Sequence, residues 1–227
     1  MLIRYSNKNI LKYTSAIRNK FSLISLLLNI YTKEFLAEVK GHHNLKIVFQ
    51  EEKKISRIFL KEIGNAQIQS FHTPFKIIEN NNDAYELRLE SSVVPCNISS
   101  VEISFLKCFF NRVDSFYTTI ENFYDAFLST LDSFAENSDI CISDSKQADY
   151  WKLILYLIEF EPGYVRYDYD EEHYIPKIHP IHHLDINFSN NATYKIGLYN
   201  SLSIDLFLEL VNKETDCFFI HEPSHSG

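Results

Sequence analysis

The residues best suited to chemistry are gathered in one stretch of the sequence, from Tyr164 to Asn187. Charged and apolar residues alternate from Val165 to Asp170, and the same alternation returns from His182 to Asn187. Because successive side chains of a strand point to opposite faces of its sheet, each segment predicts a strand with one charged face. If the two charged faces meet, four side chains become neighbours: Arg166, Asp168, His183 and Asp185. The loop between the strands would bring His173 and His179 close to them.

One chemistry open to this group is cleavage of a phosphodiester without a metal ion. That reaction needs an imidazole as general base or acid, a second proton donor, and a cation beside the negative charge that develops on the phosphorus centre. His183, His179 and Arg166 could fill these three roles.

A second chemistry would use a divalent metal. Carboxylate and imidazole ligands suit manganese, magnesium or zinc, although no standard ligand spacing is matched. The candidate ligands are Asp168, Asp170, His183 and Asp185. The cofactor prediction therefore stays open between none and a divalent metal.

A purely structural interpretation stands beside both. A histidine on an apolar strand face, such as His182, is usually a hydrogen-bonded core residue. Arg166 and Asp168 could form an ordinary ion pair. The candidate catalytic residues are Arg166, Asp168, His179, His183 and Asp185.

The elements that must position this stretch are helices and further strands. Apolar residues at helical spacing predict a first helix within Ile10 to Val39. This helix carries basic side chains, and the segment is basic overall because no acidic residue precedes Glu34. With a partly helical segment at Lys46 to Ile63, we expect residues 1–65 to form a basic helical lobe.

Residues 66–227 predict a hairpin, helices and a C-terminal sheet. His72 to Ile78 and Tyr85 to Leu89 flank a turn at 80–83 and predict a β-hairpin. Ser99 and Glu102 form a capping-box pattern that opens an aromatic-rich stretch ending near Phe134, which predicts one long helix. The remaining predicted elements are a helix at Lys146 to Phe160, strands at Tyr164 to Asp170, Ile181 to Ser189 and Thr193 to Leu198, and a helix at Ile204 to Asn212.

These elements predict an α+β fold in a single domain, 1–227, with an antiparallel sheet packed against the long aromatic-rich helix and the N-terminal helical lobe. Composition excludes two classes of nucleotide enzyme, because only five residues are glycine and none forms a dinucleotide-binding or phosphate-loop motif. The net charge of -8 argues against a protein that coats nucleic acid, although a small local site is compatible with it.

The location of the protein is also constrained. The longest aliphatic run, Leu23 to Ile30, is far shorter than the roughly 20 residues that a membrane span requires, so no membrane partner is expected. The four cysteines contain no C-x-x-C pair, which is compatible with reduced thiols. We expect a protein of the bacterial cytoplasm.

The order of these motifs resembles a known family. R-Y-D-Y-D at Arg166 to Asp170, H-P-x-x-H-L at His179 to Leu184, then Tyr194-Lys195-Ile196 and a helix with Phe207 are similar to an uncharacterised bacterial family, the domain of unknown function 2290. The specific match runs from Arg166 to His183, and the family supplies no activity. A weaker similarity is to TumE-like toxins, which show a Y-R-Y strand followed by H-P and H-H pairs.

Two functions follow as expectations. The first is a toxin-like or phage-defence protein that cleaves RNA or another phosphodiester through the Arg/His/Asp group. The alternative is a non-catalytic subunit of a multi-component bacterial defence complex, in which the basic first helix and the aromatic helices bind a larger protein partner.

Overall fold

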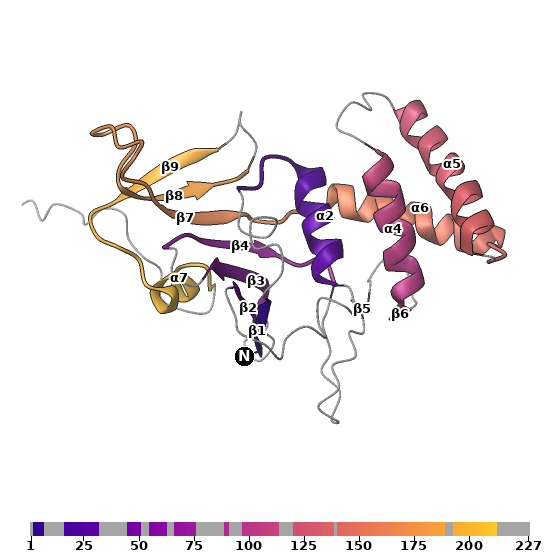
Figure 1. Cartoon of the computed structure of the whole chain (residues 1–227), viewed down its shortest axis with the longest axis horizontal. Coiled ribbons are helices and arrows are strands. Elements are labelled where there is room, and N and C mark those ends of the chain that lie inside the picture. Colours follow the sequence, from indigo (N-terminus) through magenta and orange to yellow (C-terminus); the bar gives the residue numbers. More distant parts are fainter. Residues whose placement is uncertain are drawn as a thin grey trace, which may run out of the picture.

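Figure 1 shows the computed structural model of the chain, a twisted antiparallel sheet with a helical unit at one end. The structure describes residues 2–6, 16–31, 45–50, 55–62, 66–75, 89–90, 97–113, 120–138, 140–188 and 193–212. The helices are α2 (Lys20–Ile30), α4 (Ser100–Arg112), α5 (Ile120–Ser138), α6 (Asp144–Glu159) and α7 (Ile204–Leu210). The α+β class predicted from the sequence is confirmed.

The main sheet has seven strands in the order β1-β2-β3-β4-β7-β8-β9, and every neighbouring pair is antiparallel. The strands are β1 (Leu2–Ser6), β2 (Leu45–Gln50), β3 (Ile55–Glu62), β4 (Ile68–His72), β7 (Val165–Tyr169), β8 (His182–Ile186) and β9 (Tyr194–Leu198). A separate two-stranded sheet pairs β5 (Leu89–Glu90) with β6 (Asn97–Ile98). The helices α4 to α6 lie in the chain between β4 and β7, which are neighbours in the sheet.

The N-terminal 65 residues differ from the predicted helical lobe. They contribute three strands, β1 to β3, to the main sheet, and the segment expected to be partly helical at Lys46 to Ile63 forms β2 and β3. Pairing with β1 and β4 selects the strand conformation for β2 and β3, because a short apolar segment taken alone fits either a helix or a strand. The first helix is confirmed between Lys20 and Ile30 and begins at Asn19, whose side chain accepts a hydrogen bond from the backbone of Ser22.

The single long helix predicted after Ser99 is wrong, because two helices occupy that stretch. The predicted capping box is present: Ser99 and Glu102 satisfy the first turn of α4 reciprocally. Backbone dihedrals leave the helical region at Val113, and α5 packs beside α4 (Figure 1). An aromatic stripe at helical spacing fits two helices that face each other as well as one, and here Phe109 packs against Phe123 with ring centroids 5.0 Å apart.

The C-terminal elements match their predictions closely. Helix α6 ends before Pro162, which cannot continue a helix, and the chain re-enters the sheet at β7. The predicted hairpin at 72–89 lies mostly outside the described residues. His72 ends β4, whose sheet partners are β3 and β7.

The two faces of the main sheet are covered differently. On one face, Ile58, Leu60 and Phe71 join the core formed with α2, α4, α5 and α6. On the other, Phe59, Ile68 and Tyr167 pack around Phe207 of α7. The helical unit covers only part of the first face, since the loop between β7 and β8 projects at the far end of the sheet (Figure 1). Among the described helices, none has the length and hydrophobicity needed to span a bilayer.

Candidate functional site

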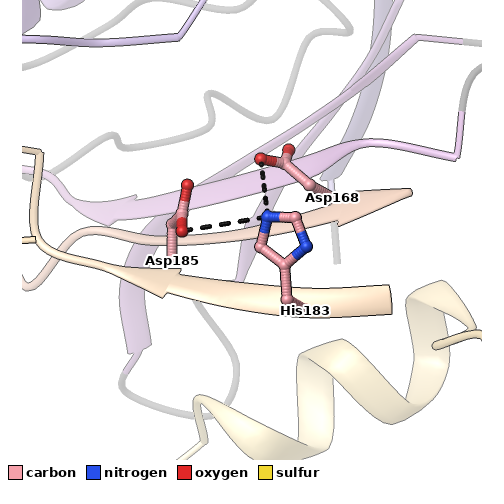
Figure 2. A group of neighbouring side chains, drawn as sticks. All are labelled: Asp168, His183 and Asp185. Carbon is pink, nitrogen blue, oxygen red and sulfur yellow. Dashed lines mark ion pairs between the residues drawn. The ribbon is translucent and has the colours of Figure 1, made fainter. Parts of the chain in front are cut away.

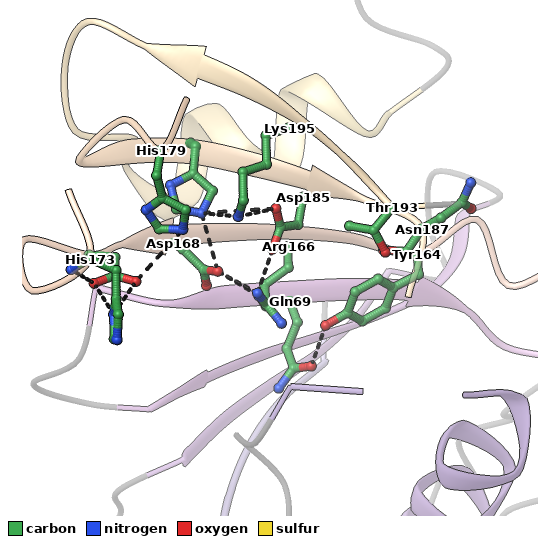
Figure 3. Close-up of polar contacts among 12 residues, drawn as sticks. Gln69, Tyr164, Arg166, Asp168, His173, His179, Asp185, Asn187, Thr193 and Lys195 are labelled. Carbon is green, nitrogen blue, oxygen red and sulfur yellow. Dashed lines mark hydrogen bonds and ion pairs between the residues drawn. The ribbon is translucent and has the colours of Figure 1, made fainter. Parts of the chain in front are cut away.

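The charged faces predicted for the two strands meet as expected. In the antiparallel register of β7 and β8, Arg166 lies opposite Asp185 and Asp168 lies opposite His183. Residues opposite each other on adjacent strands point to the same face. The four side chains therefore form one group on the sheet (Figures 2 and 3), which we call the buried group: Arg166, Asp168, His183 and Asp185.

Arg166 holds two carboxylates at once. Its Nε donates to Oδ2 of Asp168 over 2.8 Å, and its terminal nitrogen donates to Oδ2 of Asp185 over 2.5 Å. Arg166 is only 7% exposed and Asp185 only 4%, so these are charge-assisted bonds shielded from water. Burial acts to raise the pKa of Asp168, but the charge of Arg166 and the hydrogen bond from it act in the other direction, and the pKa lies below its ordinary value.

Lys195, on β9, is a member of the site that the sequence analysis did not single out. It lies opposite Asp185 in the register of β8 and β9, and its Nζ donates to Oδ1 of Asp185 over 2.8 Å. The alternation rule applied to Tyr194–Leu198 would have found it, because Lys195 is the one charged residue of that strand. Its side chain is 31% exposed, which makes it the outermost cation of the group.

The tautomer of His183 follows from its two contacts. Nδ1 lies 2.8 Å from the carbonyl oxygen of Pro180, which can only accept, so Nδ1 carries the proton. Nε2 then presents its lone pair to the ammonium of Lys195, 2.9 Å away. His183 is completely buried and is held as a neutral acceptor for Lys195.

Asp168, His183 and Asp185 could also offer ligand atoms to a metal, since one atom from each lies within 4.8 Å of the others. The contacts fit a different solution. Lys195 binds both His183 and Asp185, and Arg166 binds both carboxylates, so two protein cations already balance the two negative charges. A dication here would have to displace the ammonium of Lys195 and would leave the group with excess positive charge.

A second set of polar residues extends from the buried group into the loop between β7 and β8. The ring of His179 packs edge-on against that of His183, with centroids 4.6 Å apart. Its Nε2 lies 3.9 Å from Oδ2 of Asp170, and Nδ1 of His173 lies 3.0 Å from the other oxygen of the same carboxylate. Asp170 therefore contacts both imidazoles, and Figure 3 labels His173 and His179. We call His173, His179, Asp170 and Lys195 the rim.

The two imidazoles of the rim differ in their electrostatics. Burial, together with the positive charge of Lys195, lowers the pKa of His179. The hydrogen bond to Asp170 raises the pKa of His173, whose side chain is 70% exposed. Near neutral pH, His179 is therefore a neutral imidazole and His173 carries a larger fraction of the protonated form.

His179 carries an unusual atom. Within the described residues, its Nδ1 is the single buried side-chain nitrogen or oxygen that has no hydrogen-bond partner. Buried polar atoms are nearly always paired, and an orphaned one often marks a functional site. The side chain as a whole is 21% exposed, so His179 lies between the buried group and solvent.

The structure thus brings together all five candidate residues: Arg166, Asp168, His179, His183 and Asp185. It adds Lys195. Asp170, which the sequence analysis gave as a candidate metal ligand, and His173, which it expected nearby in the loop, lie beside His179. His182 points to the opposite face, where its Nδ1 lies 2.9 Å from the hydroxyl of Tyr167, as expected for a hydrogen-bonded packing residue.

Comparisons with known proteins add no relative. A scan against protein-family models, a search of curated proteins and a search of solved structures each found no match. The resemblance to the domain of unknown function 2290 and to TumE-like toxins stays a prediction from the sequence.

Proposed function

We propose that this protein cleaves phosphodiester bonds in RNA at the rim, without a metal ion. The observation that supports the proposal is the pair His173 and His179, two imidazoles with opposite electrostatic environments that flank Asp170 beside the ammonium of Lys195. Two titratable groups whose surroundings push their pKa values apart are the usual signature of a general acid and a general base. A toxin-like or phage-defence role would follow from such an activity in a bacterial cell.

The reaction uses the 2′-hydroxyl of RNA as its nucleophile. His179 accepts the proton of that hydroxyl, and the oxygen forms a bond to phosphorus. The bond from phosphorus to the 5′-oxygen of the next nucleotide breaks, and protonated His173 donates its proton to that oxygen. The products are a 2′,3′-cyclic phosphate and a free 5′-hydroxyl. His179 has gained one proton and His173 has lost one, so the step is balanced.

Lys195 stabilises the charge of the transition state. Its ammonium is far more exposed than the guanidinium of Arg166, and its contacts with Asp185 and His183 fix it in position before substrate binds. A preorganised cation is worth more than a mobile one because it needs no reorganisation during the reaction.

The buried group has a positioning role in this proposal. The side chains of Arg166, His183 and Asp185 are 8% exposed or less, so a bound phosphate would not reach them. Arg166 fixes Asp185, Asp185 accepts a hydrogen bond from Lys195, and His183 supports the ring of His179.

The test is cleavage of a labelled RNA by the purified full-length protein with EDTA present throughout. We expect His179→Ala and His173→Ala each to lower the rate by about a hundredfold or more. Replacing the 2′-hydroxyl at the cut site by hydrogen should abolish cleavage. His182→Ala is the matched control, because this neighbouring imidazole lies on the opposite face. Full activity of His179→Ala, or activity that EDTA removes, would overturn the proposal.

A second candidate, the non-catalytic subunit, rests on a different observation. Tyr124 and Leu128 lie one turn apart on α5 and remain 45% and 40% exposed. The described part of the first helix, α2, offers no comparable surface, because most of its residues are buried in the core. Lys8 and Lys12, two of the basic residues near the start of the chain, lie outside the described residues. In this case Tyr124→Ser combined with Leu128→Ser would abolish binding to the partner protein, whereas variants of the rim residues would still bind it.

A further inference from the structure

We propose that the substrate is single-stranded RNA and that Tyr174 and Tyr199 are the platforms on which its bases stack beside the scissile phosphate. This inference rests on the proposed function for the position of that phosphate. It adds the form of the nucleic acid and the residues that bind it.

The first observation is the position of the two tyrosines. Tyr174 directly follows His173 in the loop between β7 and β8, and its side chain is 49% exposed. Tyr199 directly follows Leu198, which pairs with His182 at the start of β8. Because β7 also ends opposite His182, the register places Tyr199 at the end of the sheet from which the loop projects. Both aromatic rings therefore lie at the same end of the sheet as the rim.

The second observation is how fully Tyr199 is exposed. Its relative exposure is 102%, so the ring has no packing role among the residues that the structure describes. Large aromatic side chains usually bury most of their area, because leaving one in water forgoes the favourable free energy of burial. A planar ring that is open on both sides suits stacking with a base.

The third observation concerns charge. The loop carries three acids, Asp170, Glu171 and Glu172, against Lys177, and the whole chain has a net charge of -8. Binding along a phosphate backbone requires several cations in a row, and duplex RNA is recognised mainly through its backbone and shape. The acidic surroundings of this site oppose that mode. Stacking on aromatic rings does not depend on backbone charge, and it requires bases that are not already stacked in a helix.

The loop itself is built firmly enough to present a platform. The backbones of Ile175 and His179 exchange two hydrogen bonds of 3.0 and 2.8 Å, which close the tip. Pro180 packs against Gly197 on β9 and fixes the base of the loop to the sheet. Tyr174 is thereby held at a set distance from His179, as positioning a base relative to the scissile phosphate requires.

The test measures binding apart from cleavage. A fluorescent single-stranded RNA with 2′-O-methyl groups at every position is bound but cannot be cut by the proposed reaction, and its Kd is measured by anisotropy. We expect Tyr199→Ala and Tyr174→Ala each to weaken binding about tenfold, within the range known for loss of one stacked base. Tyr199→Phe should bind as the wild type does. Tyr194→Ala is the matched control, an exposed tyrosine that alternation places on the opposite face of β9 from Lys195.

The outcomes separate this inference from the proposed function. Duplex RNA of the same sequence should bind more weakly than the single strand and should be cut more slowly. Equal binding of single strand and duplex, or an unchanged Kd for Tyr199→Ala, would overturn the stacking inference even if RNA is cleaved. Tyrosine-dependent binding with no cleavage of unmodified RNA would instead overturn the proposed function and leave the binding site standing.

Discussion

The ammonium of Lys195 lies 2.9 Å from Nε2 of His183, although the two residues are on different strands and twelve positions apart in the sequence. His183 can accept this bond because its other nitrogen, Nδ1, carries the proton and donates a hydrogen bond to the carbonyl oxygen of Pro180. The contact links the loop, through Pro180, to the one cation of the group that is substantially exposed. The position of Lys195 therefore depends on residues that a substrate does not touch.

Replacing Lys195 should separate charge from geometry. Lys195→Met keeps the length of the side chain and removes the charge, so we expect kcat/KM for RNA cleavage to fall by about a hundredfold or more. Lys195→Arg retains the charge and should recover part of the loss. Steady-state kinetics measure both, with Lys152→Met as the control, since Lys152 is exposed on α6 and its partner Asp149 is 3.6 Å away. Equal kinetics for Lys195→Met and the control would exclude a role for Lys195 in the reaction.

Arg166 should matter most for stability. Arg166→Met leaves the carboxylates of Asp168 and Asp185 without their shared partner in a buried site, and breaking a buried pair in this way typically costs about 3 to 5 kcal/mol. Urea denaturation measures the free energy of unfolding. Arg112→Met, which removes an exposed guanidinium bonded to two serine hydroxyls of α5, should cost less than about 1 kcal/mol. Comparable losses for the two variants would mean that the buried group contributes little to folding.

Local alternation was enough to predict much of this site. The period of two placed Arg166 with Asp168 and His183 with Asp185, and the capping box located the start of α4. Local alternation could not predict which segments pair with each other over long distances in the sequence. Nothing local in β2 and β3 distinguishes strand from helix, and the break at Val113 depends on α5 packing back on α4. The burial of His183 depends on Pro180 and Lys195, so neither its depth nor its positioning role follows from its own strand.

Gly197 is required by the approach of Pro180. A Cβ atom at this position would lie 2.9 Å from Cγ of Pro180, closer than real contacts of this kind. Gly197→Ala should therefore shift Pro180, weaken the bond from His183 to its carbonyl, and destabilise the fold by about 1 to 3 kcal/mol. The rate of cleavage by the folded fraction should fall as well, because His179 precedes Pro180. Thermal melts and kinetics on one preparation test this. Normal kinetics with full stability would show that the loop does not depend on this contact.

Asp170 should set the pH range in which the enzyme works. The general base His179 must be neutral, and its lowered pKa places the acid limb of the rate profile below the ordinary histidine value of about 6.5. The general acid His173 must be protonated, and its raised pKa places the alkaline limb above that value. The rate should therefore rise and then fall with pH, with a maximum between the two limbs.

Asp170→Asn removes the negative charge that acts to raise the pKa of both imidazoles. Both limbs should then move to lower pH, and the alkaline limb should move further, because His173 makes the closer contact with Asp170, at 3.0 Å against 3.9 Å for His179. NMR titration of the two histidine rings, run alongside the rate profile, assigns each limb to its residue. Glu172→Gln is the control, since this exposed neighbour contributes least among the groups that raise the pKa of His173. If Asp170→Asn has the same pH dependence of the cleavage rate as the wild type, His173 and His179 do not have the proposed acid and base roles.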